Sequence, residues 1–332
     1  MKLDAYMQPI VFDELRDEWN SLLHQSAADD IFLTWEWQYT WWSVYEPGDL
    51  FIVTCRDDSG SLVGLAPWFI DAGRTLRTVG CEDVTDYLDL IVRTSNEETV
   101  YEALAAFLQD HRDRFDSIAM CNIPEKSATL TRFVSLLGEN GFDVKVERND
   151  VCPLIQLPST WDDYLGLLDK KQRHELRRKM RRARGGPNEM DWYIVDQSYD
   201  LDAEIARFLK LMAASDGEKA AFLENPANME FFKQMIPLMH ERGWLRLNFL
   251  TIDGDACAAY LNFEYNERVL VYNSGFALDV HGALSPGIIL LAHNIRDAID
   301  KGLKVFDFLR GDETYKYHMG GRDTQVMKLQ AS

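Results

Sequence analysis

The sequence has no long uninterrupted hydrophobic run, which excludes a helix that crosses a membrane. No stretch approaches the roughly 18 apolar residues that such a helix needs. The first residues also lack a basic start followed by an apolar core, as a secretory leader would have. We therefore expect a cytoplasmic protein without membrane insertion. The 332 residues are 46% hydrophobic, enough to fill the cores of two ordinary domains.

Cysteine is scarce and its spacing carries no motif. The chain has five cysteines, an odd number, and they are far apart in the sequence. None forms a Cys-x-x-Cys pair or lies near histidines, so the sequence predicts neither a metal site nor a disulfide framework. We expect core thiols at Cys55, Cys81, Cys121, Cys152 and Cys257.

Positive charge is also scarce, with 35 Lys and Arg against 54 Asp and Glu and a formal net charge of −19. Most of the surface should repel phosphates, which argues against DNA as a partner. Lys170 to Arg184 is the exception, with nine Lys or Arg and one Glu. The spacing predicts a single helix from Trp161 through this segment, on which Arg173 and Arg177 share one face and form a candidate anion-binding pair. A solvated face that balances an acidic chain is the alternative.

The order of predicted elements repeats in two halves. Each half contains two helices, three meandering strands, one crossover helix and a further strand. A tandem duplication of one α/β unit accounts for this order. Pro153 and Pro158 mark the boundary, and we divide the chain into domains at 1–157 and 158–332. The expected fold class is α/β (α+β), with a mixed central sheet flanked by helices in each domain.

The loop before the second crossover helix is one candidate site. Ser285 is predicted to cap the helix, and Pro286 suits its first position. Gly282 and Gly287 allow a ligand to approach the backbone closely. A helix start of this kind can hold a pyrophosphate, although an ordinary capped helix has the same pattern. The chain has no Walker A motif, so a P-loop nucleotide hydrolase is not predicted.

A second candidate site follows the strand near 305–309. Asp307 lies within this apolar strand, where it is either a base with a raised pKa or the ion-pair partner of Arg310 or another cation. Tyr315 is a candidate proton donor, and Lys316 is a candidate group for stabilising an oxyanion. Surface residues in a turn are the alternative for both.

Three more residues are candidate substrate contacts. Asp86 and Tyr87 begin a predicted strand in the first half, where an ordinary turn is the alternative. Tyr272 belongs to a Tyr-Asn-Ser-Gly-Phe segment in the second half.

Several of these segments resemble the GNAT acyltransferase superfamily, in particular its duplicated branch. The closer resemblance is to BioF2-like and CelD-type acetyltransferases, and the more distant one is to FemABX peptidyltransferases. The most specific segment is 284–321. In GNAT enzymes the loop that enters the crossover helix binds the coenzyme A pyrophosphate, and Gly287 alone matches that motif here. The Tyr315-Lys316 pair resembles the aromatic-Lys pair of FemABX enzymes.

The resemblance implies two GNAT folds and acyl transfer from acetyl-CoA or another acyl-CoA, with no metal. Domain 158–332 would carry the donor site. In this hypothesis Lys316 stabilises the oxyanion, Tyr315 positions or protonates the leaving group, and Asp307 orients a cation or acts as the base. The donor contacts would be Ser285, Gly282, Gly287 and Arg310, and the substrate contacts would be Asp86, Tyr87, Arg173, Arg177 and Tyr272.

The acceptor in this hypothesis is an amine, a sugar or a polysaccharide precursor. Two alternatives stay open. One is transfer of an aminoacyl group from charged tRNA, which the basic segment favours and the net charge of −19 opposes. The other is a binding subunit of polysaccharide biosynthesis that does not catalyse a reaction.

Overall fold

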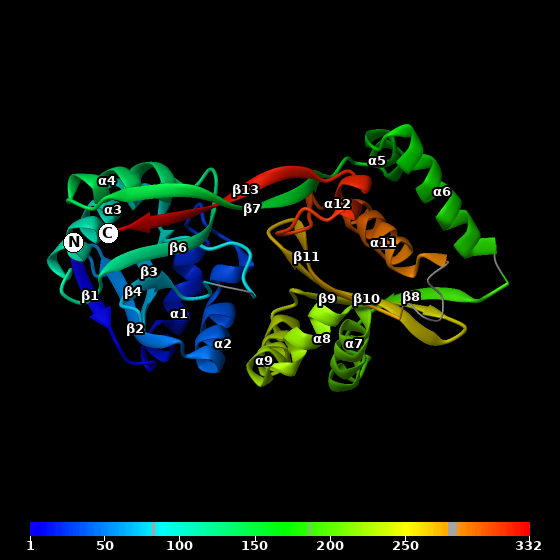
Figure 1. The fold of residues 1–332 in the computed structure, drawn as a ribbon, viewed down its shortest axis with the longest axis horizontal. Helices are drawn as coiled ribbons and strands as arrows, with labels where there is room; N and C mark the ends of the chain where they lie inside the picture. The colour runs from blue at the N-terminus through cyan, green and yellow to red at the C-terminus, as the bar shows by residue number, and fades with distance from the viewer. Residues whose placement is uncertain (82–83, 186, 278–283) are drawn as a thin grey trace. The chain divides into compact units, whose positions relative to one another are not determined.

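The computed structural model describes residues 1–81, 84–185, 187–277 and 284–332 (Figure 1). They form two compact units: unit 1 is Met1–Val151 with Thr324–Ser332, and unit 2 is Cys152–Asp323. The division into GNAT-like domains at residue 157 remains a proposal. The boundary between the two compact units lies after Val151, six residues before the predicted domain boundary. The last nine residues of the chain belong to unit 1.

Unit 1 contains a mixed sheet with the strand order β1, β2, β3, β4, β6, β13, β7, and the short strand β5 pairs with β3. Strands β4 and β6 run parallel. The main strands are β1 (Lys2–Tyr6), β2 (Gly48–Arg56), β3 (Leu62–Asp71), β4 (Thr75–Thr78), β5 (Ile91–Val92), β6 (Ser117–Pro124), β7 (Val144–Gln156) and β13 (Arg322–Ala331). The helices are α1 (Val11–Leu23), α2 (Trp35–Tyr45), α3 (Glu97–Asp110) and α4 (Val134–Glu139), the last preceded by a π-helical turn at Thr129–Phe133.

Unit 2 contains the strands β12, β11, β10, β9 and β8 in this order, beginning beside the end of β7. Its strands are β8 (Met190–Ile194), β9 (Leu245–Ile252), β10 (Asp255–Tyr265), β11 (Arg268–Phe276) and β12 (Val305–Asp307). Its helices are α5 (Trp161–Leu167), α6 (Lys170–Gly185), α7 (Leu201–Ser215), α8 (Gly217–Glu224), α9 (Pro226–Glu241), α11 (Pro286–Asp300) and α12 (Thr314–His318). In Figure 1, α7 to α9 cover one face of this sheet, and α11 with α5 and α6 covers the other.

The predicted repeat is visible in the order and direction of the strands. In unit 1 the antiparallel strands β2, β3 and β4 are followed by α3 and by β6, which is parallel to β4. In unit 2 the antiparallel strands β9, β10 and β11 are followed by α11 and by β12, which is parallel to β11. The two hairpin turns of unit 2 fall at Asp253-Gly254 and Asn266-Glu267, where all four residues have positive φ. The predicted fold class is thus confirmed.

The single helix predicted from Trp161 through the basic segment is instead two helices. Leu168 is extended, with φ −73° and ψ 146°, and it ends α5. Asp169 then starts α6, because its Oδ1 accepts a hydrogen bond from the Gln172 amide at 2.9 Å. Leu168 and Leu176 still pack in the same core cluster, so the apolar spacing survives the break.

The prediction of five free thiols is wrong for one pair. Cys81 and Cys121 form a disulfide, with their Cα atoms 5.8 Å apart. Cys81 follows β4 and Cys121 lies in β6, and these strands are neighbours in the sheet. Sequence spacing missed the pair because 40 residues separate two positions that the sheet brings together. The other three cysteines are free and buried.

The C-terminal strand β13 belongs to the sheet of unit 1. It pairs antiparallel with β6, with Val326 opposite Pro124 and Ala331 opposite Ile118. Leu329 and Ala331 are buried in the core of that sheet. Sequence order alone had assigned this strand to the second domain. None of the helices in the described part of the chain combines the length and apolar character that crossing a bilayer requires.

Candidate functional site

Strand β12 ends in a tight turn that Asp307 stabilises. Its side chain is 1% exposed, and Oδ1 accepts a hydrogen bond from the Leu309 amide at 2.9 Å. Leu309 has φ 58°, a left-handed conformation that costs a residue other than glycine about 1 to 2 kcal/mol. The hydrogen bond offsets part of that cost. Asp307 therefore shapes the start of loop 309–313, and its use as a base remains a prediction.

Lys316 is directed at the backbone of the same loop. Its side chain is 2% exposed, and Nζ donates to the carbonyl oxygens of Leu309, Arg310 and Gly311 at 3.2, 2.5 and 3.1 Å. Nζ also lies 2.8 Å from Oε2 of Glu313. Because an ammonium group has three protons, these four oxygens use its whole donor capacity. The arrangement makes Lys316 a residue that holds loop 309–313 in place.

Tyr315, next to Lys316 on α12, points to a different environment. Its ring meets Phe308 edge to face, with centroids 6.1 Å apart. Burial, and to a smaller extent the Glu313 charge, raises the pKa of Tyr315 above its ordinary value. The phenol therefore stays protonated at neutral pH and is available as a proton donor.

Tyr315 lines a cavity of about 250 Å³ at the start of α11, which we call the Tyr315 cavity. Its wall is mostly apolar, with a few hydroxyl groups among the lining residues, as is usual for small-molecule sites. The other lining residues come from β10, β11 and the α11 start: Tyr260, Ser274, Phe276, Ser285, Pro286, Gly287 and Ile288. Burial also raises the pKa of Tyr260, so both phenols are neutral.

Ser285 does not cap α11 with its side chain, contrary to the prediction. It has φ 57° and ψ 51°, whereas a residue that caps through its side chain is usually extended. Its Oγ instead accepts a hydrogen bond from Nζ of Lys179 at 2.6 Å, which brings a lysine of α6 to the start of α11. The Tyr315 cavity therefore has a hydroxyl, a nearby ammonium group and a helix N-terminus at one end.

Gly287 is required by close packing in the wall of this cavity. A Cβ atom at this position would lie 2.5 Å from Cε1 of Phe276. Any larger residue would push the Phe276 ring, which itself lines the cavity, out of place. The predicted role of Gly287, to let a ligand approach the backbone closely, stays a prediction, because the contact seen here is with the Phe276 ring.

Lys219 is a polar residue near the cavity that sequence reasoning missed. Nζ of Lys219, on α8, donates to the backbone oxygen of Ser274 at 2.7 Å and to its Oγ at 3.1 Å. Burial lowers the pKa of Lys219, against the opposing effects of Asp216 and Glu313. Ser274 lines the Tyr315 cavity, so Lys219 fixes one of its hydroxyl groups. A lone lysine on a short helix carries no sequence signal for this contact.

The remaining predicted residues do not line the Tyr315 cavity. Asp86 and Tyr87 are buried in unit 1. Tyr272 packs its ring against Phe232 of α9 and Phe263 of β10.

The two predicted arginines of α6 have different surroundings. Arg173 approaches the carbonyl oxygen of Leu165 at 3.5 Å, and Arg177 lines another cavity, described below. Arg310 belongs to loop 309–313, and Gly282 falls outside the described residues. No cluster of three or more potential metal ligands occurs among residues 1–81, 84–185, 187–277 and 284–332.

Comparison with known proteins identifies the class of this domain. Residues 170–317 match the family model for the acetyltransferase (GNAT) domain. This range contains α6, strands β8 to β12, the residues of the Tyr315 cavity and all but the last residue of α12. The chain therefore carries a domain of the GNAT superfamily, and it is a transferase of GNAT type. No curated protein matches the sequence.

Solved structures share the fold at low sequence identity. FemX has a TM-score of 0.68 and 11% identity, covering 99% of this chain and 97% of that chain. A tandem GNAT protein from the clavulanic acid biosynthesis pathway has a TM-score of 0.50 and 12% identity, covering 99% of this chain and 98% of that chain. The L-PGS structure from Bacillus licheniformis has a TM-score of 0.57 and 9% identity, covering 94% of this chain and 90% of that chain. These likenesses extend the GNAT-like and Fem-like fold over nearly the whole chain.

Proposed function

We propose that the protein transfers an acyl group from acetyl-CoA or another acyl-CoA to an amine or hydroxyl group. The observation that carries this proposal is the Tyr315 cavity. Ser285 and Gly287, at the start of α11, line this cavity together with the neutral phenol of Tyr315. A donor with a phosphate group and a reactive acyl group needs both features in one place.

In this proposal some residues of the cavity bind the donor and others take part in acyl transfer. Lys179, Ser285 and the first amides of α11 bind the phosphates of the donor, because all present positive charge or hydrogen-bond donors. The acceptor forms a new bond to the acyl carbon as the carbon–sulfur bond breaks. Tyr315 gives its proton to the leaving sulfur, while the acceptor loses its proton to solvent or a base.

Lys316 and Asp307 act as positioning residues in this proposal. Both are buried at the two ends of loop 309–313, and both bond to its backbone. The oxyanion role predicted for Lys316 requires Nζ to leave at least one of its present carbonyl partners. Turnover of a Lys316 variant, compared with its stability, separates the two roles.

The acceptor class remains that of the sequence hypothesis. We propose a saccharide, a polysaccharide precursor or another small amine or alcohol, and a cytoplasmic reaction. The predicted substrate contacts are Asp86, Tyr87, Arg173, Arg177 and Tyr272. The large apolar share of the Tyr315 cavity wall fits the acyl chain and thioester better than a polar acceptor.

Calorimetric titration with acetyl-CoA tests the proposal directly. We expect micromolar binding that survives Lys316→Met and weakens in Ser285→Ala, since only the second change removes a group that lines the cavity. Arg173→Ala with Arg177→Ala tests whether the predicted arginine pair takes part. Absence of acetyl-CoA binding to the intact protein would refute the acyl-CoA proposal.

Aminoacyl transfer from charged tRNA is a second candidate, favoured by the local charge of α6. This helix carries nine Lys or Arg in a chain of net charge −19. Binding of tRNA should weaken steeply as salt is raised, because each neutralised phosphate releases counterions. A binding constant that does not depend on salt would exclude this candidate.

A further inference from the structure

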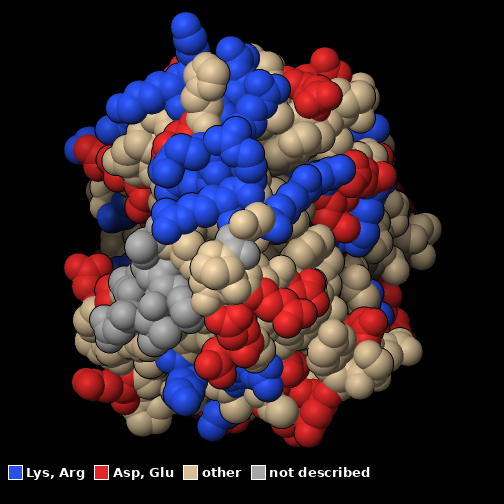
Figure 2. Space-filling view, turned by 90° about the vertical axis from the view of Figure 1, so that its right-hand side faces the viewer, with Lys and Arg blue, Asp and Glu red and all other residues tan. Residues whose placement is uncertain are grey.

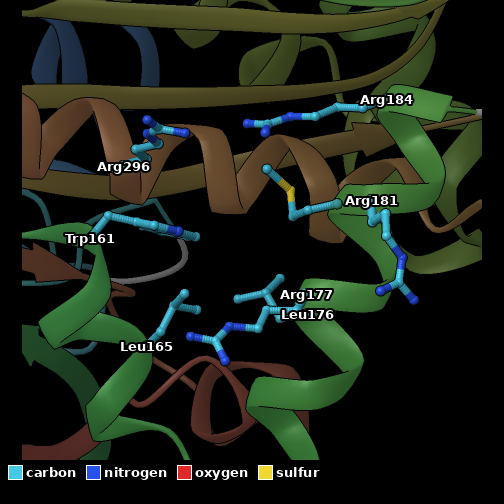
Figure 3. A pocket seen from close by; sticks show the side chains of 8 residues that line it. Trp161, Leu165, Leu176, Arg177, Arg181, Arg184 and Arg296 are labelled. Atoms are coloured by element: carbon cyan, nitrogen blue, oxygen red, sulfur yellow. The ribbon is translucent and has the colours of Figure 1, made fainter.

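A second cavity, of about 360 Å³, lies between α5, α6 and α11 (Figure 3). We call it the arginine cavity, because four of its eight lining residues are arginines. Its lining is Trp161, Leu165, Leu176, Arg177, Met180, Arg181, Arg184 and Arg296. None of these residues lines the Tyr315 cavity, so the proposed acyl transfer does not account for it.

Helix geometry gathers the arginines around one hollow. Arg177, Arg181 and Arg184 follow one another at intervals of four and three residues, which places them on one face of α6. Arg296 comes from α11, which packs against α6. In Figure 3 the side chains of Arg184 and Arg296 extend toward one another across the cavity. Figure 2 shows the broad patch of Lys and Arg on this face of the molecule.

Little negative charge offsets these arginines. Within the described part of the chain, Arg177, Arg181 and Arg184 form no ion pair or hydrogen bond, and Arg296 has a distant contact with Asp300 at 3.7 Å. Glu175 of the same helix pairs with Arg178 and Lys179 instead. Four like charges around one hollow repel each other, and a bound anion would relieve that repulsion.

The positive charge of this region affects the pKa of a neighbouring histidine, His293. His293 of α11 stacks on Trp192, with ring centroids 4.9 Å apart. Burial lowers the pKa of His293, and the charges of Arg184 and Arg296 lower it further. The charges of two cavity arginines thus act on the same neighbouring group, opposed by the charge of Asp191.

The other half of the lining is apolar and aromatic. Leu165 and Leu176 are buried in the core of unit 2, and Met180 packs against the same core. The Trp161 ring extends into the hollow in Figure 3 and packs on one side against Tyr164, with centroids 5.0 Å apart. A bare inorganic anion would leave this surface without a partner, whereas a ring next to a phosphate would cover it.

We propose that the arginine cavity binds a nucleoside diphosphate or a molecule that contains one. The phosphates would lie among Arg177, Arg181, Arg184 and Arg296, since guanidinium groups pair well with phosphate oxygens. The base would pack on the Trp161 ring and the apolar floor. A nucleic-acid strand fits less well, because it needs a row of aromatic platforms along a groove and this hollow has one tryptophan.

Calorimetry of the intact protein with ADP tests the proposal at 0.15 M salt. We expect ADP to bind, and the pair Arg177→Gln with Arg184→Gln to weaken binding about tenfold or more, because bonds to charged groups are lost. The matched control is Lys171→Gln with Arg178→Gln, which removes the same charge from α6 outside the cavity lining. This control should change the affinity less than twofold.

Two further variants locate the site. Trp161→Leu should weaken ADP several-fold and leave inorganic pyrophosphate unchanged, because it removes the ring and keeps the arginines. Ser285→Ala, in the Tyr315 cavity, should leave ADP binding at the arginine cavity unchanged while it weakens acetyl-CoA, so the two tests have separate readouts.

Three outcomes would overturn the proposal: no ADP binding, equal weakening by both double substitutions, or loss of binding in Ser285→Ala. Binding of single-stranded RNA or of anionic phospholipid vesicles, with none of ADP, would also overturn it and assign α6 to a polymer or a membrane surface. Thermal melting of each variant checks that the fold is retained.

Discussion

Nζ of Lys316 lies 2.8 Å from Oε2 of Glu313, and the two side chains differ sharply in exposure, at 2% and 56%. The ammonium group is buried, and the carboxylate reaches solvent. The pair therefore contributes less through its charges than the hydrogen bonds from Lys316 to three carbonyl groups of loop 309–313.

Lys316→Met should lower the free energy of unfolding by about 2 to 4 kcal/mol, because three buried carbonyl groups lose their donor. Urea denaturation followed by tryptophan fluorescence measures this. Glu313→Gln is the control and should cost less than about 1 kcal/mol, since the carboxylate is exposed. A variant of unchanged stability with turnover reduced a hundredfold would instead support the oxyanion role.

Tyr315→Phe should reduce the turnover number by about a hundredfold or more and leave the Michaelis constant of the donor nearly unchanged. The substitution removes one hydroxyl that is proposed to protonate the leaving group, and it keeps the contact with Phe308. Release of free thiol from acetyl-CoA provides the assay. Because the pKa of Tyr315 is raised, the wild-type rate should show no loss from its ionisation up to about pH 10. An equal rate for both proteins would remove Tyr315 from the mechanism.

Gly287→Ala should raise the Michaelis constant for the acyl donor about tenfold or more. The added Cβ would lie 2.5 Å from Cε1 of Phe276, so the ring must move within the cavity that the donor would occupy. Gly166→Ala is the matched control, because a Cβ at that position of α5 meets no atom within 4 Å. Initial rates over a range of donor concentrations distinguish the two variants, and identical curves would contradict the site assignment.

Asp89 should make unit 1 less stable as the pH rises from about 4 to 6. It is buried, and its Oδ1 accepts from Oγ1 of Thr129 at 2.5 Å. Burial raises the pKa of Asp89 to about 6, against hydrogen bonds that lower it. The folded chain then binds more protons at this group than the unfolded chain, so its contribution to stability falls across this range and is constant above it.

Asp89→Asn should therefore remove this slope, and its stability relative to wild type should rise by about 2 kcal/mol between pH 4 and pH 7. Urea denaturation at several pH values measures the difference. Asp110→Asn, at an exposed position at the end of α3, is the control. A constant difference between wild type and Asp89→Asn would show that the folded-state pKa of Asp89 is ordinary.

Sequence periodicity predicted much of the fold of unit 2 because its signals are local. The turns at Asp253-Gly254 and Asn266-Glu267 and the helix after Pro286 depend on neighbouring residues. The disulfide between Cys81 and Cys121 depends on two strands that meet in the sheet, and the pairing of β13 with β6 spans about 200 residues. Contacts between residues so far apart do not change the local periodicity of the sequence, so a single sequence does not predict them.

In the candidate site, too, the sequence indicated residues at the ends of strands and helices but not the contacts between distant residues. Tyr315, Ser285 and Gly287 stand beside recognisable strand and helix ends, and the structure places all three around one cavity. The hydrogen bond from Lys179 to Ser285 joins residues 106 positions apart, and that from Lys219 to Ser274 joins residues 55 apart. Both depend on helix packing, which determines where a long side chain ends.

The return of β13 to unit 1 has a consequence for synthesis on the ribosome. Strand β6 acquires its partner from residues that are translated only after the whole of unit 2. At about 5 to 20 residues per second, the roughly 200 residues between β6 and β13 take roughly 10 to 40 seconds. During that time the edge of β6 is without this partner, while the residues of unit 2 are translated. Unit 1 can therefore complete its sheet only when the last nine residues are made, directly after unit 2 ends, so the N-terminal unit does not mature ahead of the C-terminal one as is usual along a chain.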